Sequence, residues 1–534
     1  MKRLPVSTHV FSKIISSDYV YIDKTEAIYQ LIQGECYFFA RPRRFGKSLL
    51  CSTLKSLFLG QKELFKGLWI DAKSDYKWSY HPVVHLDFLT IACSSPEELL
   101  MSIMRDLDAI AQSYNLEPLA FTNPGEMLKV LVKKLAQKSN SGVVIIIDEY
   151  DKAILDHLHN NAIAEKMRTI LKNFYVFIKG LNEHLRFVLI TGVSRFSQTS
   201  IFSGLNNMLD ISMDPLFATL VGCNEQELRS FLMEHINITA ANKKISPSEL
   251  IDEMRTMYNG YRFWKDLPLR QLESGTEPQR IFNPFSVINA LHSDALDNYW
   301  FRSGTPTFLI HLLKTHNYPV ETLDGIKADL SELETFEIDK LSLTTLFYQT
   351  GYLTIKDYNP STKNFTLTYP NQEVKDAFLN NILALIGEFQ INQINTYTSV
   401  LRKALNQENT TEFIDQLKKF YALIPYSIHI DKEKYYQTIF FVLLKLIGAE
   451  IDVEIDTNIG RIDAVIETKK ALYIIEFKLK QKASIALEQI KRKKYFERYL
   501  NDSRHIILIG ITFDASQKNI SDSLVEALDR NKIA

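Results

Sequence analysis

The chain carries a short phosphate-loop pattern, Gly46-Lys47-Ser48, placed between a short apolar run and a helical pattern. A strand–loop–helix junction presents free backbone N–H groups and the positive end of the helix dipole to an anion. Lys47 would reach the β- and γ-phosphates of a nucleotide, and the Ser48 hydroxyl would bind Mg²⁺. The full pattern starts with glycine, where this chain has Arg41, in a loop that also holds Arg44. These cations suit phosphate.

A second acidic group follows about 100 residues later, where Asp148 and Glu149 end the apolar run 142–147. At a strand end beside a phosphate loop, Asp148 would orient Mg²⁺ and Glu149 would polarise the attacking water. Alone, the Gly-Lys-Ser triplet is usually a charged helix start, and the acidic pair is usually a solvated strand end. Together and in this order they predict nucleotide binding, with hydrolysis as a further expectation.

Polar residues also follow the predicted strand 186–191, namely Thr191, Ser194 and Arg195. A polar residue there could sense the γ-phosphate, and Arg195 could stabilise charge in the transition state. The alternative is an ordinary strand end with a surface arginine. The sequence leaves both readings open.

A different chemistry is indicated near the C-terminus, where Asp463, Glu476 and Lys478 lie on two predicted strands joined by a turn. Glu476 and Lys478 are two residues apart and therefore share a face, and a hairpin would bring Asp463 towards Glu476. Two carboxylates can hold Mg²⁺, and Lys478 can activate water and offset phosphate charge. Glu433 could add a third carboxylate. The alternative is the charged face of a ribbon, although Glu476 interrupts an apolar strand where an unpaired carboxylate is costly.

The same region is basic. Residues 461–500 contain eleven Lys and Arg against five Asp and Glu, a net charge of +6. A helix there carries Gln489 and the run 491–494, which is Lys-Arg-Lys-Lys. Such a patch could contact a phosphate backbone, and a solvated helix face explains the run equally well.

These residues need an α/β framework to bring them together. Continuous apolar runs separated by helical patterns predict a buried parallel sheet within residues 15–225, with strands at 36–40, 83–88, 142–147 and 186–191. The strand at 83–88 lies between the two motifs along the chain, which suits ATPases with an inserted strand. Ser95, Pro96 and Glu98 predict a capping box that starts a helix reaching Ile110.

The remainder of the chain reads as three further regions. Residues 224–327 are mainly helical and irregular, and 341–369 combine a helix with two alternating runs around Asn359-Pro360-Ser361, a hairpin signal compatible with a winged helix. Residues 372–430 are helical. The last hundred residues alternate helix and strand, which predicts a second α/β unit.

Composition sets the outer limits. The 534 residues are 46% hydrophobic with a formal net charge of −1, which excludes a disordered chain and a globally basic coat. Four scattered cysteines without a CxxC pair favour reduced thiols in the cytoplasm. No stretch suggests a signal peptide or a membrane span, so the expectation is a cytoplasmic protein without a membrane partner.

Taken together, the chain resembles the bacterial family that joins an N-terminal AAA-ATPase-like domain to a C-terminal PD-(D/E)XK nuclease-superfamily domain. The matching stretches are YVYIDKT (19–25), FARPRRFGKSLL (39–50), IIIDEYDKAI (145–154), ITGVSRFS (190–197), MYNGYRF (257–263), FNPFSV (282–287), YWFRSGTP (299–306), and GRIDAVIE with YIIEFKL.

The resemblance implies an α/β multidomain protein with a P-loop ATPase parallel-sheet core, a helical and winged-helix middle and a restriction-endonuclease-like α/β end. The expected boundaries are 1–225, 226–330, 331–385, 386–430 and 431–534. Nucleotide contacts are implied at Gly46, Lys47 and Ser48, with acidic roles at Asp148 and Glu149.

The nuclease-type positions implied are Asp463, Glu476 and Lys478, with Gln489 on the following helix. Ile462 replaces the proline that names the superfamily. Some branches place a tyrosine four residues after the helix glutamine, where this chain has Lys493, and Tyr495 lies two residues further on.

The leading hypothesis is an ATP-binding protein, and an ATPase, coupled to a Mg²⁺-dependent nuclease that acts on DNA. ATP and Mg²⁺ are the expected cofactors. A second hypothesis is a nucleotide-switched regulator or scaffold with a silent nuclease-like domain, and a third is an ATPase whose C-terminal unit only binds nucleic acid. The ATPases that this domain resembles often act as rings, so a homo-oligomer is an open expectation.

Overall fold

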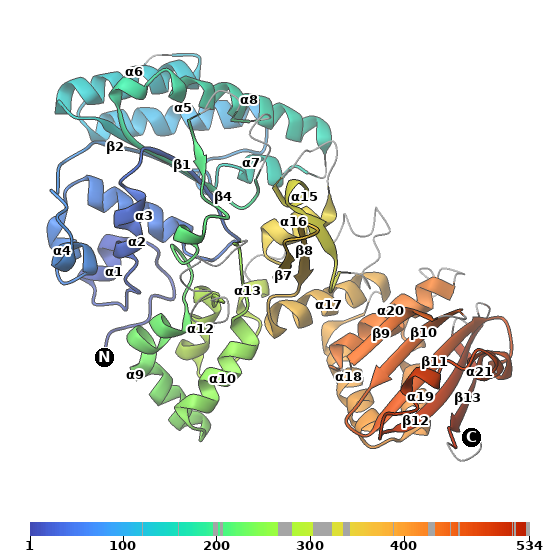
Figure 1. Cartoon of the computed structure of the whole chain (residues 1–534). Helices are drawn as coiled ribbons and strands as arrows, with labels where there is room; N and C mark the ends of the chain where they lie inside the picture. Colours follow the sequence, from blue (N-terminus) through green and yellow to red (C-terminus); the bar gives the residue numbers. More distant parts are fainter. Residues whose placement is uncertain are drawn as a thin grey trace. The chain divides into compact units, whose positions relative to one another are not determined.

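A computed structural model describes the chain from residue 1 to residue 529 with gaps. It leaves out residues 120, 159, 196–200, 203–206, 265–279, 303–322, 335–341, 388, 425–432, 449, 458–459, 515, 517–518 and 530–534. Side chains are also left out at 385–387, 433–435, 450–457 and 460–462. The chain divides into two compact units (Figure 1). Unit 1 comprises Met1–Phe308 and Asp324–Val374, and unit 2 comprises Leu309–Leu323 and Lys375–Ala534.

Unit 1 is built on a five-stranded parallel sheet of order β2-β3-β4-β1-β5. Its strands are β1 (Cys36–Ala40), β2 (Val83–Asp87), β3 (Val143–Asp148), β4 (Leu185–Gly192) and β5 (Leu209–Asp210). Every residue of β1 and β3 is buried, as expected where helices cover both faces of a sheet. The inserted strand between β1 and β3 is β4, whereas β2 lies outside β3.

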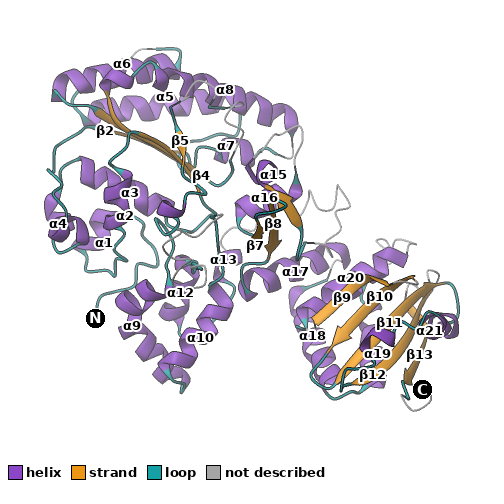
Figure 2. Ribbon diagram, viewed as in Figure 1, coloured by secondary structure: helices purple, strands orange, loops and turns teal. Residues whose placement is uncertain are grey.

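Helices flank this sheet (Figures 1 and 2). They are α1 (Phe11–Ser16), α2 (Thr25–Leu31), α3 (Lys47–Phe58), α4 (Trp69–Lys73), α5 (Pro96–Ser113), α6 (Pro124–Ser139), α7 (Lys152–Leu155) and α8 (Asn161–Lys179), with short 3₁₀ turns at Lys62–Phe65, Asn182–His184 and Pro215–Phe217. Helix α3 lies on one side of the sheet, and α5, α6 and α8 lie on the other. The Ser95 hydroxyl caps α5 by accepting from the Glu98 amide, but the Glu98 carboxylate accepts from the Ser94 amide, so the predicted capping box does not close.

The helices after the sheet form their own core in unit 1. They are α9 (Glu225–Lys243), α10 (Pro247–Tyr258), α12 (Pro284–Ser293) and α13 (Tyr299–Arg302). Capping boxes start α9 at Asn224 and α10 at Ser246, which fixes both helix beginnings. Apolar side chains of α9, α10 and α12 pack together with Leu4 and Val20 from the N-terminal segment.

A small antiparallel sheet of order β6-β8-β7 completes unit 1. Its elements are β6 (Lys327–Asp329), α15 (Leu330–Glu334), α16 (Leu343–Thr350), β7 (Thr354–Asn359) and β8 (Asn364–Thr368). Asn359 accepts from the Ser361 and Thr362 amides at 2.9 and 3.2 Å, which fixes the turn. The predicted hairpin is therefore confirmed, and it follows helix α16.

Unit 2 packs helices against a mixed five-stranded sheet of order β13-β12-β11-β10-β9 (Figure 2). Its strands are β9 (Glu450–Thr457), β10 (Gly460–Glu467), β11 (Ala471–Leu479), β12 (His505–Asp514) and β13 (Asn519–Ala527). Its helices are α17 (Gln372–Gly387), which begins in unit 1, α18 (Ile391–Asn406), α19 (Thr410–Tyr421), α20 (Glu433–Leu446) and α21 (Ala483–Arg492), with a 3₁₀ turn at Glu497–Tyr499. Strands β11 and β12, which are connected along the chain by α21, pair in parallel. The other strand pairings of this sheet are antiparallel.

The close approach of α21 to this sheet depends on Gly510 in β12. A Cβ at Gly510 would lie 2.5 Å from the carbonyl oxygen of Ala483 at the start of α21. The α/β multidomain class predicted from the sequence is confirmed by the two sheets. In the part of the chain that the structure describes, no helix combines the length and apolar character needed to cross a bilayer.

Candidate functional site

The predicted phosphate loop joins β1 to α3. Gly46 is the N-cap of α3 and has a left-handed backbone with φ of +101°, which glycine adopts without strain. As a glycine, Gly46 has no side chain that could cap the first amides of this helix. Ser48 lies half-buried in the first turn of α3, and Arg44 is exposed with its guanidinium 4.8 Å above the ring of Phe285.

Lys47 and Glu149 come together although they are far apart in the sequence. The Lys47 ammonium is almost completely buried and donates to the carbonyl oxygens of Arg41 and Pro42, at 2.9 and 3.2 Å. It also forms a 2.9 Å ion pair with the Glu149 carboxylate. A buried cation needs such a counter-charge, and a phosphate can take the same place.

Asp148 ends β3 beside Asp87, which ends β2 in register with it. The Asp148 carboxylate accepts from the Thr191 hydroxyl of β4 at 2.5 Å. Burial raises the pKa of Asp87, and the neighbouring Asp148 adds to that rise. Sequence analysis missed Asp87, although it follows an apolar run in the same way as Asp148 does. Two acidic strand ends beside a phosphate loop are suited to Mg²⁺.

Asp151 is a second residue that sequence analysis gave no role. It is fully buried and accepts from the amides of Val193 and Ser194 and from the Ser194 hydroxyl. Burial raises the pKa of Asp151 to about 6, and the charge of Glu149 adds to the shift. Ser194 therefore ties the loop after β4 to the loop after β3, which holds the acidic residues in place.

The arginines of this region are held by protein groups. Arg41 lies between the rings of Phe39 and Phe263, at 4.5 and 4.6 Å, and donates to the Ser212 carbonyl at 2.5 Å. Burial lowers the pKa of Arg41 to about 9. The side chain of Arg41, one of the cations that make this loop compatible with phosphate, therefore braces the fold between these rings. Arg195 is buried in a 2.7 Å ion pair with Asp210, so it is not a surface arginine.

The middle of the chain packs directly on the phosphate loop. The ring of Phe45 contacts those of Tyr261 and Phe263, with centroids 4.7 and 5.6 Å apart. The Trp300 indole donates to the Arg43 carbonyl at 2.9 Å. The sequence indicated no chemistry for the motifs that hold these residues, MYNGYRF (257–263) and YWFRSGTP (299–306). Nothing local in the sequence indicates contacts with a loop more than 200 residues away.

In unit 2 the antiparallel pairing of β10 with β11 brings Asp463 next to Glu476. The Asp463 carboxylate accepts from the Phe477 amide at 2.8 Å. Glu476 is buried, and its Oε1 atom accepts from the Lys478 ammonium at 2.8 Å and from the Gln489 amide. The predicted residues Asp463, Glu476, Lys478 and Gln489 are thus gathered at one end of β11.

Tyr495 joins this group. Helix α21 ends at Arg492, and the left-handed backbone of Lys494 turns the chain back. The Tyr495 hydroxyl then lies 3.4 Å from the Gln489 amide, whereas Lys493 takes no part in this contact. Burial raises the pKa of Tyr495, with smaller contributions from Glu476 and Asp463. Tyr495, six positions after Gln489, thus reaches the Gln489 amide, whereas the resemblance implied a tyrosine four positions after Gln489 in some branches.

The donor set in unit 2 fits a hard divalent cation. Asp463 and Glu476 supply carboxylate oxygens, which Mg²⁺ prefers together with water. Within the described residues, no group of three or more His, Cys, Asp or Glu side chains gathers at one point. Glu433, the predicted third carboxylate, begins α20, and its side chain lies outside the described residues.

The folds and sites define a class, namely a P-loop α/β unit joined to a nuclease-like α/β unit. Residues 5–202 match the family described as a predicted AAA-ATPase, and residues 431–523 match the PD-(D/E)XK nuclease superfamily. The chain belongs to the family that joins these two domains, as the resemblance implied. It is 33% identical over 539 residues, 99% of each chain, to the "Uncharacterized protein in vnfD 5'region" of Azotobacter chroococcum mcd 1.

Proposed function

We propose that unit 1 binds and hydrolyses ATP with Mg²⁺, and that unit 2 is a Mg²⁺-dependent nuclease acting on DNA under the control of the ATP cycle. One observation carries this proposal. Each unit holds a lysine–carboxylate ion pair at the positions that its family's chemistry uses, Lys47 with Glu149 and Lys478 with Glu476.

In unit 1 the nucleotide phosphates would replace Glu149 as the partner of Lys47. Glu149 would then be released to accept a proton from the attacking water. Arg44, Gly46 and Ser48 would hold the phosphates and the cation together with Asp148. Bound Mg²⁺ would supply positive charge that offsets the charge of the phosphates.

In unit 2, Asp463 and Glu476 would hold the metal ion. Bound Mg²⁺ would supply Lewis-acid stabilisation of the phosphodiester. Lys478, displaced from Glu476, would orient the attacking water and offset the charge of the phosphodiester. Gln489 and Tyr495 lie where they can position a substrate group. The basic run 491–494, which begins in the last turn of α21, would contact the DNA backbone.

For unit 1, equilibrium titration with ATP and Mg²⁺ tests the site. Lys47→Ala should abolish measurable binding, because it removes the only lysine in the loop and leaves Glu149 without that counter-charge. Lys55→Ala, eight residues later in the same helix, is the control and should bind as the wild type does. Retained binding by Lys47→Ala would show that the loop is not the nucleotide site.

For unit 2, the test is cleavage of duplex DNA with Mg²⁺ or Mn²⁺. Asp463→Ala and Glu476→Ala should each reduce the rate by at least about a thousandfold, since catalysis by a metal centre is lost with its ligands. Glu488→Ala, an exposed carboxylate on α21, is the matched control. Equal cleavage by all variants would overturn the assignment. No cleavage by the wild type, with ATP binding intact, would favour the regulator with a silent nuclease-like domain.

A further inference from the structure

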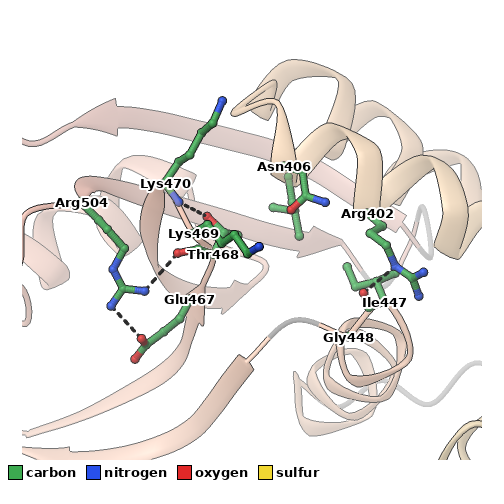
Figure 3. A pocket seen from close by; sticks show the side chains of 10 residues that line it. Arg402, Asn406, Ile447, Gly448, Glu467, Thr468, Lys469, Lys470 and Arg504 are labelled. Carbon is green, nitrogen blue, oxygen red and sulfur yellow. Dashed lines mark hydrogen bonds and ion pairs between the residues drawn. The ribbon is translucent and has the colours of Figure 1, made fainter. Parts of the chain in front are cut away.

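Unit 2 contains a cavity of about 600 Å³ that the proposed nuclease chemistry does not use (Figure 3). Helix α18 forms one side of it, and the turn between β10 and β11 forms the other. The lining residues are Arg402, Leu405, Asn406, Ile447, Gly448, Glu467, Thr468, Lys469, Lys470 and Arg504. The cavity adjoins the first residues of β11, whereas Glu476 lies five residues further along, about 17 Å for an extended strand.

The charges around the cavity are unequal. Arg504 donates to the Thr468 carbonyl at 3.0 Å and forms ion pairs with Glu467 and Asp502 at 2.8 and 2.6 Å, so its charge is compensated. Figure 3 shows Arg504 and Glu467 together on one side. Glu467, an acidic residue of the lining, is therefore already paired with Arg504.

Among the residues that the structure describes, three cations of the lining lack such compensation. Arg402 donates to the carbonyls of Ile447 and Leu446, at 2.7 and 3.1 Å, which caps the end of α20 but supplies no negative charge. Lys469 and Lys470 are exposed at the turn, and neither forms an ion pair with any residue that the structure describes. A concave surface with uncompensated cations favours an anionic ligand.

The remaining lining residues indicate what chemical class of ligand the cavity would accept. Leu405 and Ile447 offer an apolar wall, and Asn406 adds an amide that can orient a ligand, whereas the Thr468 hydroxyl is used within the turn by the Ala471 carbonyl and the Lys470 and Ala471 amides. An apolar wall with few polar groups and a volume between 300 and 1,000 Å³ is typical of small-molecule sites. A nucleic acid backbone would instead call for an extended charged track.

We propose that this cavity binds a small phosphorylated molecule with an apolar ring, the chemistry of a nucleoside monophosphate. The phosphate lies against Lys469, Lys470 and Arg402, and the ring lies against Leu405 and Ile447. This site is separate from Lys47 and from Glu476, so it stands whether or not unit 1 binds ATP and unit 2 cleaves DNA.

The test uses calorimetric titration of the full-length protein with each common deoxynucleoside 5′-monophosphate and with inorganic phosphate. At least one monophosphate should bind saturably and more tightly than inorganic phosphate. Lys469→Gln/Lys470→Gln should weaken that binding at least about tenfold, the effect of one lost charge-assisted contact. Lys418→Gln/Lys419→Gln, the same charge change on α19 outside the cavity, should leave it unchanged. The lysine pair is preferred to Arg402 and Arg504, whose removal would also break helix-end and ion-pair contacts.

Two further measurements keep the outcomes separate. Binding of the monophosphate should persist in Lys47→Ala, and its loss there would assign it to unit 1 and overturn the proposal. Absence of saturable binding by every monophosphate would also overturn it. Weaker binding of a duplex oligonucleotide by the double variant, without monophosphate binding, would overturn it in favour of a nucleic acid contact.

Discussion

The two units hold their lysine–carboxylate pairs in opposite ways. In unit 1 the Lys47 side chain is 2% exposed and its partner Glu149 is 11% exposed. In unit 2 the Lys478 side chain is 16% exposed and its partner Glu476 is 2% exposed. The more buried member of a pair is the one that most needs a counter-charge from whatever replaces its partner. Unit 1 is thus prepared for an incoming anion and unit 2 for an incoming cation.

The two pairs also differ in what supports them. Lys47 and Glu149 come from different elements, and their loop is braced by residues such as Tyr261 and Trp300. Glu476 and Lys478 stand two residues apart on one strand, and among the described residues their hydrogen-bond contacts come from the β10–β11 hairpin and helix α21. The first site therefore depends on the whole of unit 1, and the second depends on a local motif.

The largest predicted effect tests this dependence at Gly260, which has a φ of +115°. A Cβ at this position would lie 1.8 Å from the Pro370 carbonyl oxygen, a backbone atom that cannot move away cheaply. Gly260→Ala should lower the free energy of unfolding of unit 1 by about 4 kcal/mol, combining backbone strain with the clash. All four tryptophans of the chain lie before residue 308, so tryptophan fluorescence during urea unfolding follows unit 1 selectively.

Gly67→Ala is the matched control for this measurement. Gly67 also has a positive φ, +81°, but nothing lies within 4 Å of a Cβ built there. It should cost only about 1 kcal/mol, the strain of the backbone alone. Equal destabilisation by the two variants would show that the contact between Gly260 and Pro370 does not support the loop.

The second prediction concerns pH and the contacts of Trp300. The Glu373 carboxylate is buried and accepts from the Trp300 amide at 2.7 Å and from the Ser286 hydroxyl. Burial raises the pKa of Glu373 from 4.5 to about 7. Between pH 4.5 and pH 7 the native state therefore binds a proton that the unfolded state has lost. The stabilisation that this proton provides is complete below pH 4.5 and is lost as the pH rises through 7. Between pH 8 and pH 5 this group should add roughly 3 kcal/mol to the stability of unit 1.

Glu373→Gln isolates this contribution, because the amide keeps acceptor capacity and does not titrate. The difference between the wild type and Glu373→Gln in unfolding free energy should change across pH 5–8, followed by tryptophan fluorescence. An identical pH dependence for both proteins would contradict the prediction. Unit 2 contains no tryptophan, so its own titrations do not enter the signal.

The difference in support also explains what could be predicted from the sequence. The strands, Lys47 with Asp148, and Asp463 with Glu476 and Lys478 follow from local patterns: an apolar run, its charged end and a spacing of two. The bracing role of Arg41 could not be predicted, because a buried guanidinium held by Phe39 and Phe263 has no local signature in the sequence. The roles of Tyr261 and Trp300 and the return of Tyr495 depend on tertiary packing, which spacing along the chain does not encode.

The third prediction removes the internal partner from each pair. Glu149→Gln should tighten ATP binding about tenfold, because the phosphates no longer compete with a carboxylate for Lys47, while hydrolysis falls sharply. Lys478→Met should tighten Mg²⁺ binding about tenfold at Glu476, while DNA cleavage is lost. Calorimetric titration measures both affinities. The two substitutions remove opposite charges. Tighter ligand binding in both units would therefore indicate that the ligand replaces the internal ion-pair partner.

Surface ion pairs supply the controls for this exchange. Glu165→Gln removes the partner of Arg168 in unit 1, and Lys491→Met removes the partner of Glu526 in unit 2. Both pairs are substantially exposed, so neither change should move the ligand affinity. Weaker ATP binding in Glu149→Gln, or weaker Mg²⁺ binding in Lys478→Met, would mean that the ion pair is needed for the geometry of the site. It would contradict the view that the pair only competes with the ligand.

The smallest predicted effect concerns the single hydrogen bond that connects Trp300 to the phosphate loop. Trp300→Phe removes the indole donor to the Arg43 carbonyl but keeps an aromatic ring near Tyr352. The loop should lose about 1 kcal/mol of support, which corresponds to a roughly fivefold weaker affinity for ATP. Trp300 should also report ATP binding by a change in emission that disappears in the variant, whereas Trp69→Phe should keep both the affinity and the signal. Unchanged affinity for ATP in Trp300→Phe would mean that the phosphate loop is held by its own backbone. The contrast between a site supported at long range in unit 1 and a local site in unit 2 would then rest on the aromatic contacts of Phe45 alone.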